Sequence, residues 1–209
     1  MEQIELTLQG LEDYFTKEAY NVLRSNLQFC GKDIKVIMLT SCEANEGKTT
    51  VSMHLGKSFA DLGKKVLVID ADMRKSVLAG RNTNAKNAQG LSEILTGFAT
   101  KKDVIYQTQF ENLKVLFAGK YPPNPVELLS SRHFSDLLED LRNNEKFDYI
   151  IVDTPPLGLV IDAAVVAPMC DGVVLVMNDN AKYRQVENVI EQLRKSDSKI
   201  LGVVRNRIS

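Results

Sequence analysis

Six short runs rich in Val and Ile limit what this 209-residue chain can fold into. Most of the runs are continuous rather than alternating, which is typical of strands buried on both faces of a parallel sheet. Such a sheet needs helices on both sides, so the runs predict an α/β domain. The predicted strands are Ile34 to Thr40, Val66 to Asp70, Leu113 to Ala118, Tyr149 to Asp153, Gly172 to Met177 and Ile200 to Val204.

Helical patterns separate these runs. Apolar residues recur at i, i+3, i+4 and i+7 in the segment after Thr49, in Arg132 to Arg142 and in Gln185 to Leu193. Ser131 is placed to cap the second of these helices. Strands that alternate with helices predict βαβ units and one three-layer domain with a doubly wound, mostly parallel sheet.

A further helix is predicted from Phe15 to Phe29, before the first strand and outside the alternation. We therefore expect a single domain, residues 1–209, made of an N-terminal helical segment, residues 1–32, and a core, residues 33–209. The stretch from Lys75 to Gly90 is polar and rich in Asn, which predicts a surface loop.

The composition argues against several classes of function. Lys and Arg number 26 and Asp and Glu number 27, so the chain lacks the basic field of a nucleic-acid-binding protein. Three cysteines without a C-x-x-C pair indicate neither a disulfide framework nor a zinc site. No apolar run reaches the roughly 20 residues that cross a bilayer, and the N-terminus lacks signal-peptide features, so we expect a cytoplasmic location.

The strongest local signal is Gly47-Lys48-Thr49-Thr50, directly after a predicted strand and before a helical pattern. In a P-loop, backbone N–H groups at a helix N-terminus hold phosphates, the Lys neutralises their charge and the Thr hydroxyl reaches Mg²⁺. We expect residues 45–50 to bind ATP: Asn45, Glu46, Gly47, Lys48, Thr49 and Thr50. The usual first Gly of the motif is replaced by Cys42. A thiol near a helix N-terminus can have a lowered pKa and act as a redox switch, but we expect an ordinary thiol here.

Carboxylates follow two other predicted strands. Asp70 and Asp72 end one of them two residues apart, and the period of a strand would aim both side chains the same way. Such a pair can hold a metal and accept a proton. Asp153, before Thr-Pro-Pro, ends another strand and is expected to contact Mg²⁺. Because the carboxyl ends of parallel strands meet at one edge of a sheet, we expect these side chains to converge on the P-loop.

Together these motifs resemble the Walker A, A′ and B set of the bacterial protein-tyrosine kinases of capsule and exopolysaccharide production. The resemblance covers nearly the whole chain and includes the run Pro122-Pro-Asn-Pro-Val-Glu-Leu-Leu129. It implies a P-loop NTPase fold, ATP and Mg²⁺ as cofactors, and transfer of the γ-phosphoryl group to protein tyrosines. The implied catalytic residues are Lys48, Asp70, Asp72 and Arg74, and the implied metal ligands are Thr49, Asp72 and Asp153; which Asp is the base stays open.

The resemblance also implies partners. These are a membrane adaptor of the polysaccharide co-polymerase type, whose cytoplasmic tail activates the kinase at the inner face of the membrane, tyrosine substrates and a cognate phosphatase. A homo-oligomer is implied through the helix that carries Glu18 and Arg24, although Asn21 stands where relatives have another Arg. Relatives also carry a tyrosine cluster after the last strand, which this sequence does not contain.

Two other functions remain open. One is a non-catalytic or weakly hydrolytic ATP-binding module that regulates polysaccharide export. The other is an ATPase of the partition type, which predicts hydrolysis stimulated by DNA or lipid.

Overall fold

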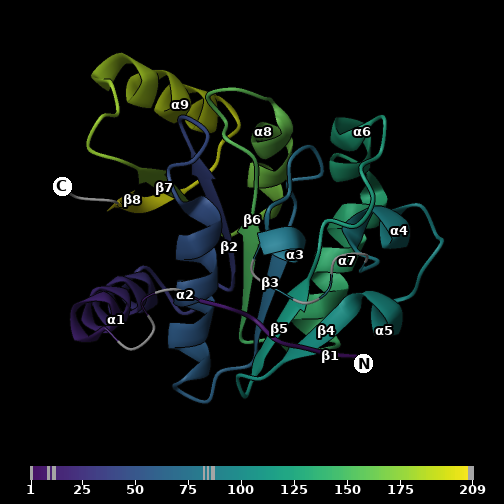
Figure 1. Cartoon of the computed structure of the whole chain (residues 1–209). Helices are drawn as coiled ribbons and strands as arrows, with labels where there is room; N and C mark the ends of the chain where they lie inside the picture. Colours follow the sequence, from purple (N-terminus) through teal and green to yellow (C-terminus); the bar gives the residue numbers. More distant parts are fainter. Residues whose placement is uncertain are drawn as a thin grey trace.

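The computed structural model describes residues 2–8, 10, 13–81, 83, 85 and 88–206. Its centre is an eight-stranded sheet that is parallel except where β4 runs antiparallel to β5 (Figure 1). The strands, in spatial order, are β1 (Gln3–Ile4), β4 (Ile105–Thr108), β5 (Leu113–Leu116), β3 (Val66–Asp70), β6 (Tyr149–Asp153), β2 (Val36–Ser41), β7 (Gly172–Met177) and β8 (Ile200–Arg205). The doubly wound α/β class is therefore confirmed.

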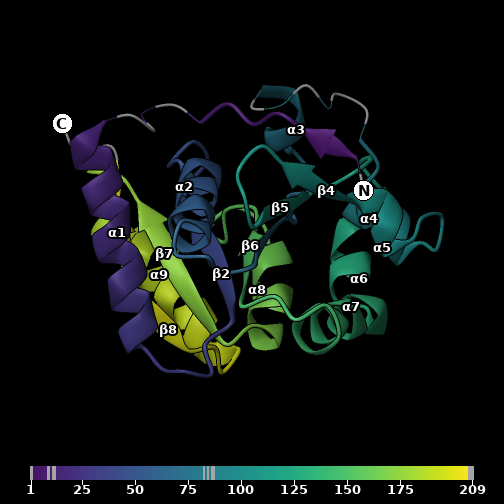
Figure 2. The same cartoon turned by 90° about the horizontal axis from the view of Figure 1, so that it is seen from below.

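Helices cover both faces of the sheet, as the continuous apolar runs predict. Figure 2 shows α2 and α8 on opposite sides of it. The helices are α1 (Tyr14–Phe29), α2 (Lys48–Ala60), α3 (Leu78–Arg81), α4 (Leu91–Leu95), α5 (Lys101–Val104), α6 (Pro125–Leu129), α7 (Arg132–Asn143), α8 (Asp162–Val166), the 3₁₀ turn η1 (Ala167–Met169) and α9 (Tyr183–Lys195).

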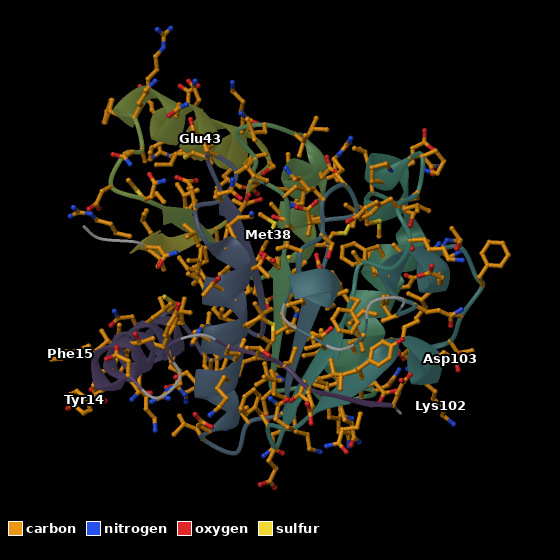
Figure 3. All side chains as sticks on the ribbon, in the orientation of Figure 1. Tyr14, Phe15, Met38, Glu43, Lys102 and Asp103 are labelled. Carbon is orange, nitrogen blue, oxygen red and sulfur yellow. The ribbon has the colours of Figure 1, made fainter. Side chains whose placement is uncertain are left out.

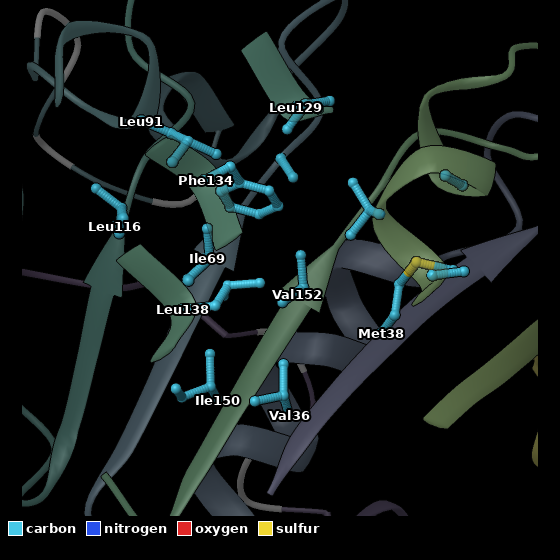
Figure 4. Close-up of a cluster of buried hydrophobic side chains, with 14 of the residues drawn as sticks. Val36, Met38, Ile69, Leu91, Leu116, Leu129, Phe134, Leu138, Ile150 and Val152 are labelled. Atoms are coloured by element: carbon cyan, nitrogen blue, oxygen red, sulfur yellow. The ribbon is translucent and has the colours of Figure 1, made fainter. Parts of the chain in front are cut away.

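Alternate residues of each central strand enter different cores. Val36 and Met38 of β2 pack with Phe134 and Leu138 of α7 (Figure 4), whereas Ile37 faces the other layer, which contains α1 and α2. All of these side chains are buried. Burial of both strand faces is what makes the sequence of β2 continuous rather than alternating.

Two strands have no counterpart among the predicted ones. β1 and β4 have two and four residues, too few to show a period, and they form through main-chain pairing with a neighbour. The helix predicted from Phe15 to Phe29 is present as α1, but segment 1–32 also contains β1, which adds to the edge of the sheet and includes buried Ile4.

Local features also differ. The predicted loop 75–90 contains α3, whose Leu78 is buried, while positions 82, 84, 86 and 87 lie outside the described residues. Ser131 does occupy the N-cap position of α7, but its hydroxyl donates to the Leu128 carbonyl at 2.6 Å instead of accepting from the helix. In the described ranges, no helix combines the length and apolarity that a bilayer crossing needs.

Candidate nucleotide site

The loop between β2 and α2 has the backbone of an anion-binding turn. Asn45 and Gly47 adopt left-handed conformations, with φ of 64° and 88°, and α2 begins at Lys48. No side chain caps this helix, so its first N–H groups are left for a ligand. Lys48 is buried at the same point. The loop can therefore bind phosphates through its backbone and one cation.

Asp153 lies directly against the start of α2. The Thr49 hydroxyl donates to Asp153 Oδ2 at 2.5 Å, and the Ser52 hydroxyl donates to Oδ1 at 3.3 Å. Burial raises the pKa of Asp153, while nearby Lys48 and the Thr49 hydrogen bond act against that rise. The predicted convergence of the P-loop and the end of β6 is thus present in the structure.

Asp70 sits opposite Asp153 in the register of β3 and β6. Its carboxylate accepts hydrogen bonds from the Ser76 hydroxyl at 2.5 Å and from the Asp72 N–H at 3.0 Å. Burial raises the pKa of Asp70 to about 8, with the charge of Asp153 as the second cause. A buried carboxyl group with a near-neutral pKa suits proton exchange.

Asp72 has a different environment, because β3 ends at Asp70 and strand period no longer applies. Its carboxylate accepts from the N–H groups of Arg74 and Lys75, at 3.2 and 2.8 Å, and is half-buried. The expectation that strand period aligns Asp70 with Asp72 is therefore wrong. The charge of Asp72 nevertheless raises the pKa of both Asp70 and Asp153, so the three carboxylates are close neighbours.

Arg74 does not point freely into the site. Its Nε donates to both oxygens of Asp162, at 2.9 and 3.1 Å, and Asp162 is fully buried at the start of α8. Sequence reasoning missed Asp162, which lies 88 residues further along the chain and belongs to no motif.

The P-loop is braced by the ends of β7 and β8, which sequence reasoning also missed. The Glu46 carboxylate accepts from the N–H of Glu43 at 2.8 Å and of Asn178 at 3.3 Å, and the Asn206 amide donates to the Glu46 carbonyl at 2.8 Å. Gln185 of α9 donates to Glu43, which lies beside that helix in Figure 3. The side chain of Glu46 is thus committed to the protein, and its N–H is the part left for a phosphate.

Cys42 is buried, and its surroundings are acidic. Burial and the charges of Glu46 and Glu43 raise the pKa of its thiol to about 11, which argues against a redox switch. The loop after β6 packs closely here, because a Cβ on Gly158 would stand 2.1 Å from the Cys42 carbonyl oxygen. A glycine is required where the two loops touch.

The oxygen donors at the start of α2 fit Mg²⁺. Within the described part of the chain, no group of three His, Cys, Asp or Glu side chains is arranged to hold a metal by itself. Mg²⁺ usually takes one or two protein oxygens and completes its shell with water and substrate phosphates. Thr49 and Asp153, in contact beside a phosphate-binding loop, are such a pair.

Glu18 and Arg24 of α1 form hydrogen bonds inside the chain. Arg24 donates to the carbonyl and the hydroxyl of Ser58 on α2, both at 2.8 Å, and to the Asn21 side chain at 2.9 Å. Asn21 in turn donates to Glu18 at 3.0 Å. His54 of α2 is stacked on the Tyr20 ring of α1, with centroids 4.8 Å apart.

Comparison with known proteins matches the AAA domain family over residues 34–202. Tyrosine-protein kinase CpsD of Streptococcus agalactiae serotype Ia is 44% identical over 195 residues, 93% of this chain and 83% of that protein. Tyrosine-protein kinase YwqD of Bacillus subtilis is 35% identical over 90% of this chain and 80% of its own.

Several solved structures are also similar to this chain. The chimerical protein CapA2B2 has a TM-score of 0.89 and 33% identity, covering 100% of this chain and 93% of that chain. The kinase domain of the Escherichia coli tyrosine kinase ETK has a TM-score of 0.84 and 33% identity, with 92% of this chain and 75% of that one covered. The septum site-determining protein MinD from Pyrococcus horikoshii, solved with Mg-ADP, has a TM-score of 0.69 and 28% identity, covering 84% of this chain and 71% of that one.

Proposed function

This chain belongs to the AAA domain family and, within it, to the bacterial protein-tyrosine kinases of capsule biosynthesis, and we propose how its residues divide the work of phosphoryl transfer. ATP is the phosphoryl donor. The N–H groups of residues 45–50 bind its phosphates, and Lys48 neutralises charge on the β- and γ-phosphates.

Thr49 and Asp153 hold Mg²⁺, with Asp72 at the more open side of the site. The ion supplies charge neutralisation on the phosphates when bound. The observation that carries this assignment is the 2.5 Å contact between the Thr49 hydroxyl and the Asp153 carboxylate, beside buried Lys48. In that contact, the two oxygens already lie where one hard cation can touch both.

Transfer breaks the bond between the γ-phosphorus and the oxygen that leaves with ADP, and forms a bond from that phosphorus to the tyrosine hydroxyl oxygen. The hydroxyl proton passes to Asp72, or to Asp70 when the Asp70 carboxyl group is ionised. Asp70 has the near-neutral pKa, and Asp72 has the more accessible carboxylate. Arg74 steadies the transferring group after exchanging its Asp162 contact for the phosphoryl oxygens.

The assay uses labelled ATP, Mg²⁺, a tyrosine-containing peptide and the cytoplasmic tail of the adaptor. We expect phosphotyrosine on the peptide, and its loss in Lys48→Met. Lys57→Met is the matched control, because Lys57 lies on the same helix but pairs with Asp61 outside the site. Nucleotide binding without transfer would favour the regulatory-module alternative, and transfer that survives Lys48→Met would refute the site assignment.

We further propose that an adaptor recruits the kinase to the inner face of the membrane, that a cognate phosphatase reverses its action, and that the N-terminal segment 1–32 supports homo-oligomers through α1. Tyr14, Phe15 and Phe29 of α1 are exposed, and the first two point outward in Figure 3. Arg24 contributes by fixing α1 on α2, and Glu18 by accepting a hydrogen bond from Asn21 on the same helix. Sedimentation of the wild-type chain and of Phe15→Ser tests this: an unchanged sedimentation coefficient would contradict it.

A further inference from the structure

One exposed tyrosine lies in a loop beside the nucleotide site. Tyr121 belongs to the connection from β5 to α6, and β5 is the neighbour of β3 in the sheet. The connection leaves β5 at the same edge where Asp70 ends β3 (Figure 1). Sixty per cent of Tyr121 is exposed.

The Tyr121 hydroxyl donates to the main-chain carbonyl of Ser76 at 3.1 Å. Ser76 is the residue whose own hydroxyl donates to Asp70 at 2.5 Å. Two hydrogen bonds through one residue therefore connect an accessible tyrosine hydroxyl to a buried carboxylate of the site.

The backbone before Tyr121 is held in place. The buried Glu93 carboxylate accepts from the N–H groups of Gly90 and Lys120, at 2.7 and 3.2 Å. Gly119 has a φ of 79°, and a Cβ there would stand 2.0 Å from that carboxylate. Tyr121 is thus presented from an anchored turn.

We propose that Tyr121 is a phosphoryl acceptor of this kinase and that its modification limits the kinase's own activity. This inference rests on the proposed function. The bond between the γ-phosphorus of ATP and the departing ADP oxygen breaks, a bond to Tyr121 Oη forms, and the hydroxyl proton passes to a site carboxylate or to water.

The phosphorylated side chain loses the donor that holds the Ser76 carbonyl. The phosphate group also carries nearly two negative charges, which are repelled by the Ser76 carbonyl oxygen and by the Asp72 carboxylate. The contact between the two loops then opens, and Ser76 no longer holds the Asp70 carboxylate in its position.

The test is peptide mapping by mass spectrometry after incubation with Mg-ATP and the adaptor tail, with transfer to an added tyrosine peptide measured in the same samples. We expect phosphate on Tyr121, none in Lys48→Met, and a several-fold fall in the rate of peptide transfer after preincubation with ATP. Tyr121→Phe should keep a constant rate. Tyr183→Phe is the matched control, since Tyr183 is 80% exposed at the start of α9, and should behave as wild type.

Peptide transfer with an unmodified Tyr121 would overturn this inference and leave the proposed function standing. Absence of transfer to peptide and to Tyr121 alike would overturn both. Phosphate on Tyr121 without a change in rate would overturn the regulatory part.

Discussion

At the scale of single residues, the site is defined by its buried carboxylates. Asp70 and Asp153 are buried at adjacent strand ends, and Lys48 is the cation whose charge acts on Asp153. Their identities are predictable, because strand ends in an open α/β sheet face the ligand crevice. Their burial is not predictable from the sequence, because it depends on packing between distant segments.

The raised pKa of Asp70 has a consequence for stability. The folded protein keeps this proton up to about pH 8, while the unfolded chain loses it near pH 3.8, so between these values the native state binds more protons and its stability falls as pH rises. We predict that, without nucleotide and in EDTA, the stability of Asp70→Asn relative to wild type increases from pH 5 to pH 8. Above pH 8 it should not increase further. Denaturation by urea at pH 5, 7 and 9 measures this.

Asp136→Asn serves as the control, because Asp136 is an exposed carboxylate on α7. It should show no comparable trend. A difference between Asp70→Asn and wild type that does not change with pH would contradict the buried, protonated Asp70.

Cys42 gives a second prediction at this scale. A thiol with a pKa of about 11 is almost entirely protonated at pH 8, and the thiolate is the reactive form. We expect iodoacetamide to label Cys42 more slowly than half-buried Cys30, with peptide mapping as the measurement. Fast labelling of Cys42 would contradict this prediction and support a reactive thiol.

At the scale of elements, the phosphate-binding loop depends on its neighbours. Gly47-Lys48-Thr49 identifies the loop from the sequence alone, because the backbone requirement is local. The bracing contacts from Asn178 and Asn206 could not be predicted in this way, since they join segments more than 130 residues apart.

The contact between this loop and the loop after β6 predicts that a substitution there weakens nucleotide binding without unfolding the protein. In Gly158→Ala, the new methyl group must displace the Cys42 carbonyl, because it would otherwise stand 2.1 Å from that oxygen, far below contact distance. We expect nucleotide affinity to fall at least tenfold, about 1.4 kcal/mol, while the fold is kept. Gly202→Ala in β8, where a Cβ would meet nothing within 4 Å, is the control. Equal affinity in the two variants, measured by titration calorimetry, would argue against coupling of the loops.

The attachment of α1 to α2 is a second property of elements. Arg24→Met removes the donors to Ser58, and we expect a loss of about 1–3 kcal/mol in the free energy of unfolding. Chemical denaturation measures it, with Arg132→Met as the control at a 91% exposed side chain. A loss no larger than that of the control would mean that α1 is held by its apolar contacts alone.

At the scale of the whole molecule, the sequence predicts six of the eight strands that the structure describes, but not β1 and β4, which are neighbours at one end of the sheet. Continuous apolar runs report burial on two faces, so they are visible without a structure. A short edge strand exists through its hydrogen bonds to a neighbour, which no local pattern of side chains records.

Ligand binding should stabilise the folded molecule as a whole. Mg-ATP at a hundredfold excess over its Kd is expected to add about 2.7 kcal/mol to the free energy of unfolding, seen as a rise in Tm. Thr49→Val should bind ATP equally well with Mg²⁺ or with EDTA, because one oxygen ligand is missing. Retention of the Mg²⁺ effect in this variant would remove Thr49 from the metal site.

The helix α2 begins at Lys48 and contacts α1 at Ser58, so about 15 Å of continuous helix joins the phosphate-binding loop to the N-terminal helix. A helix this short cannot bend much without losing main-chain hydrogen bonds. A displacement of α1 is therefore transmitted through α2 to the residues that bind the triphosphate.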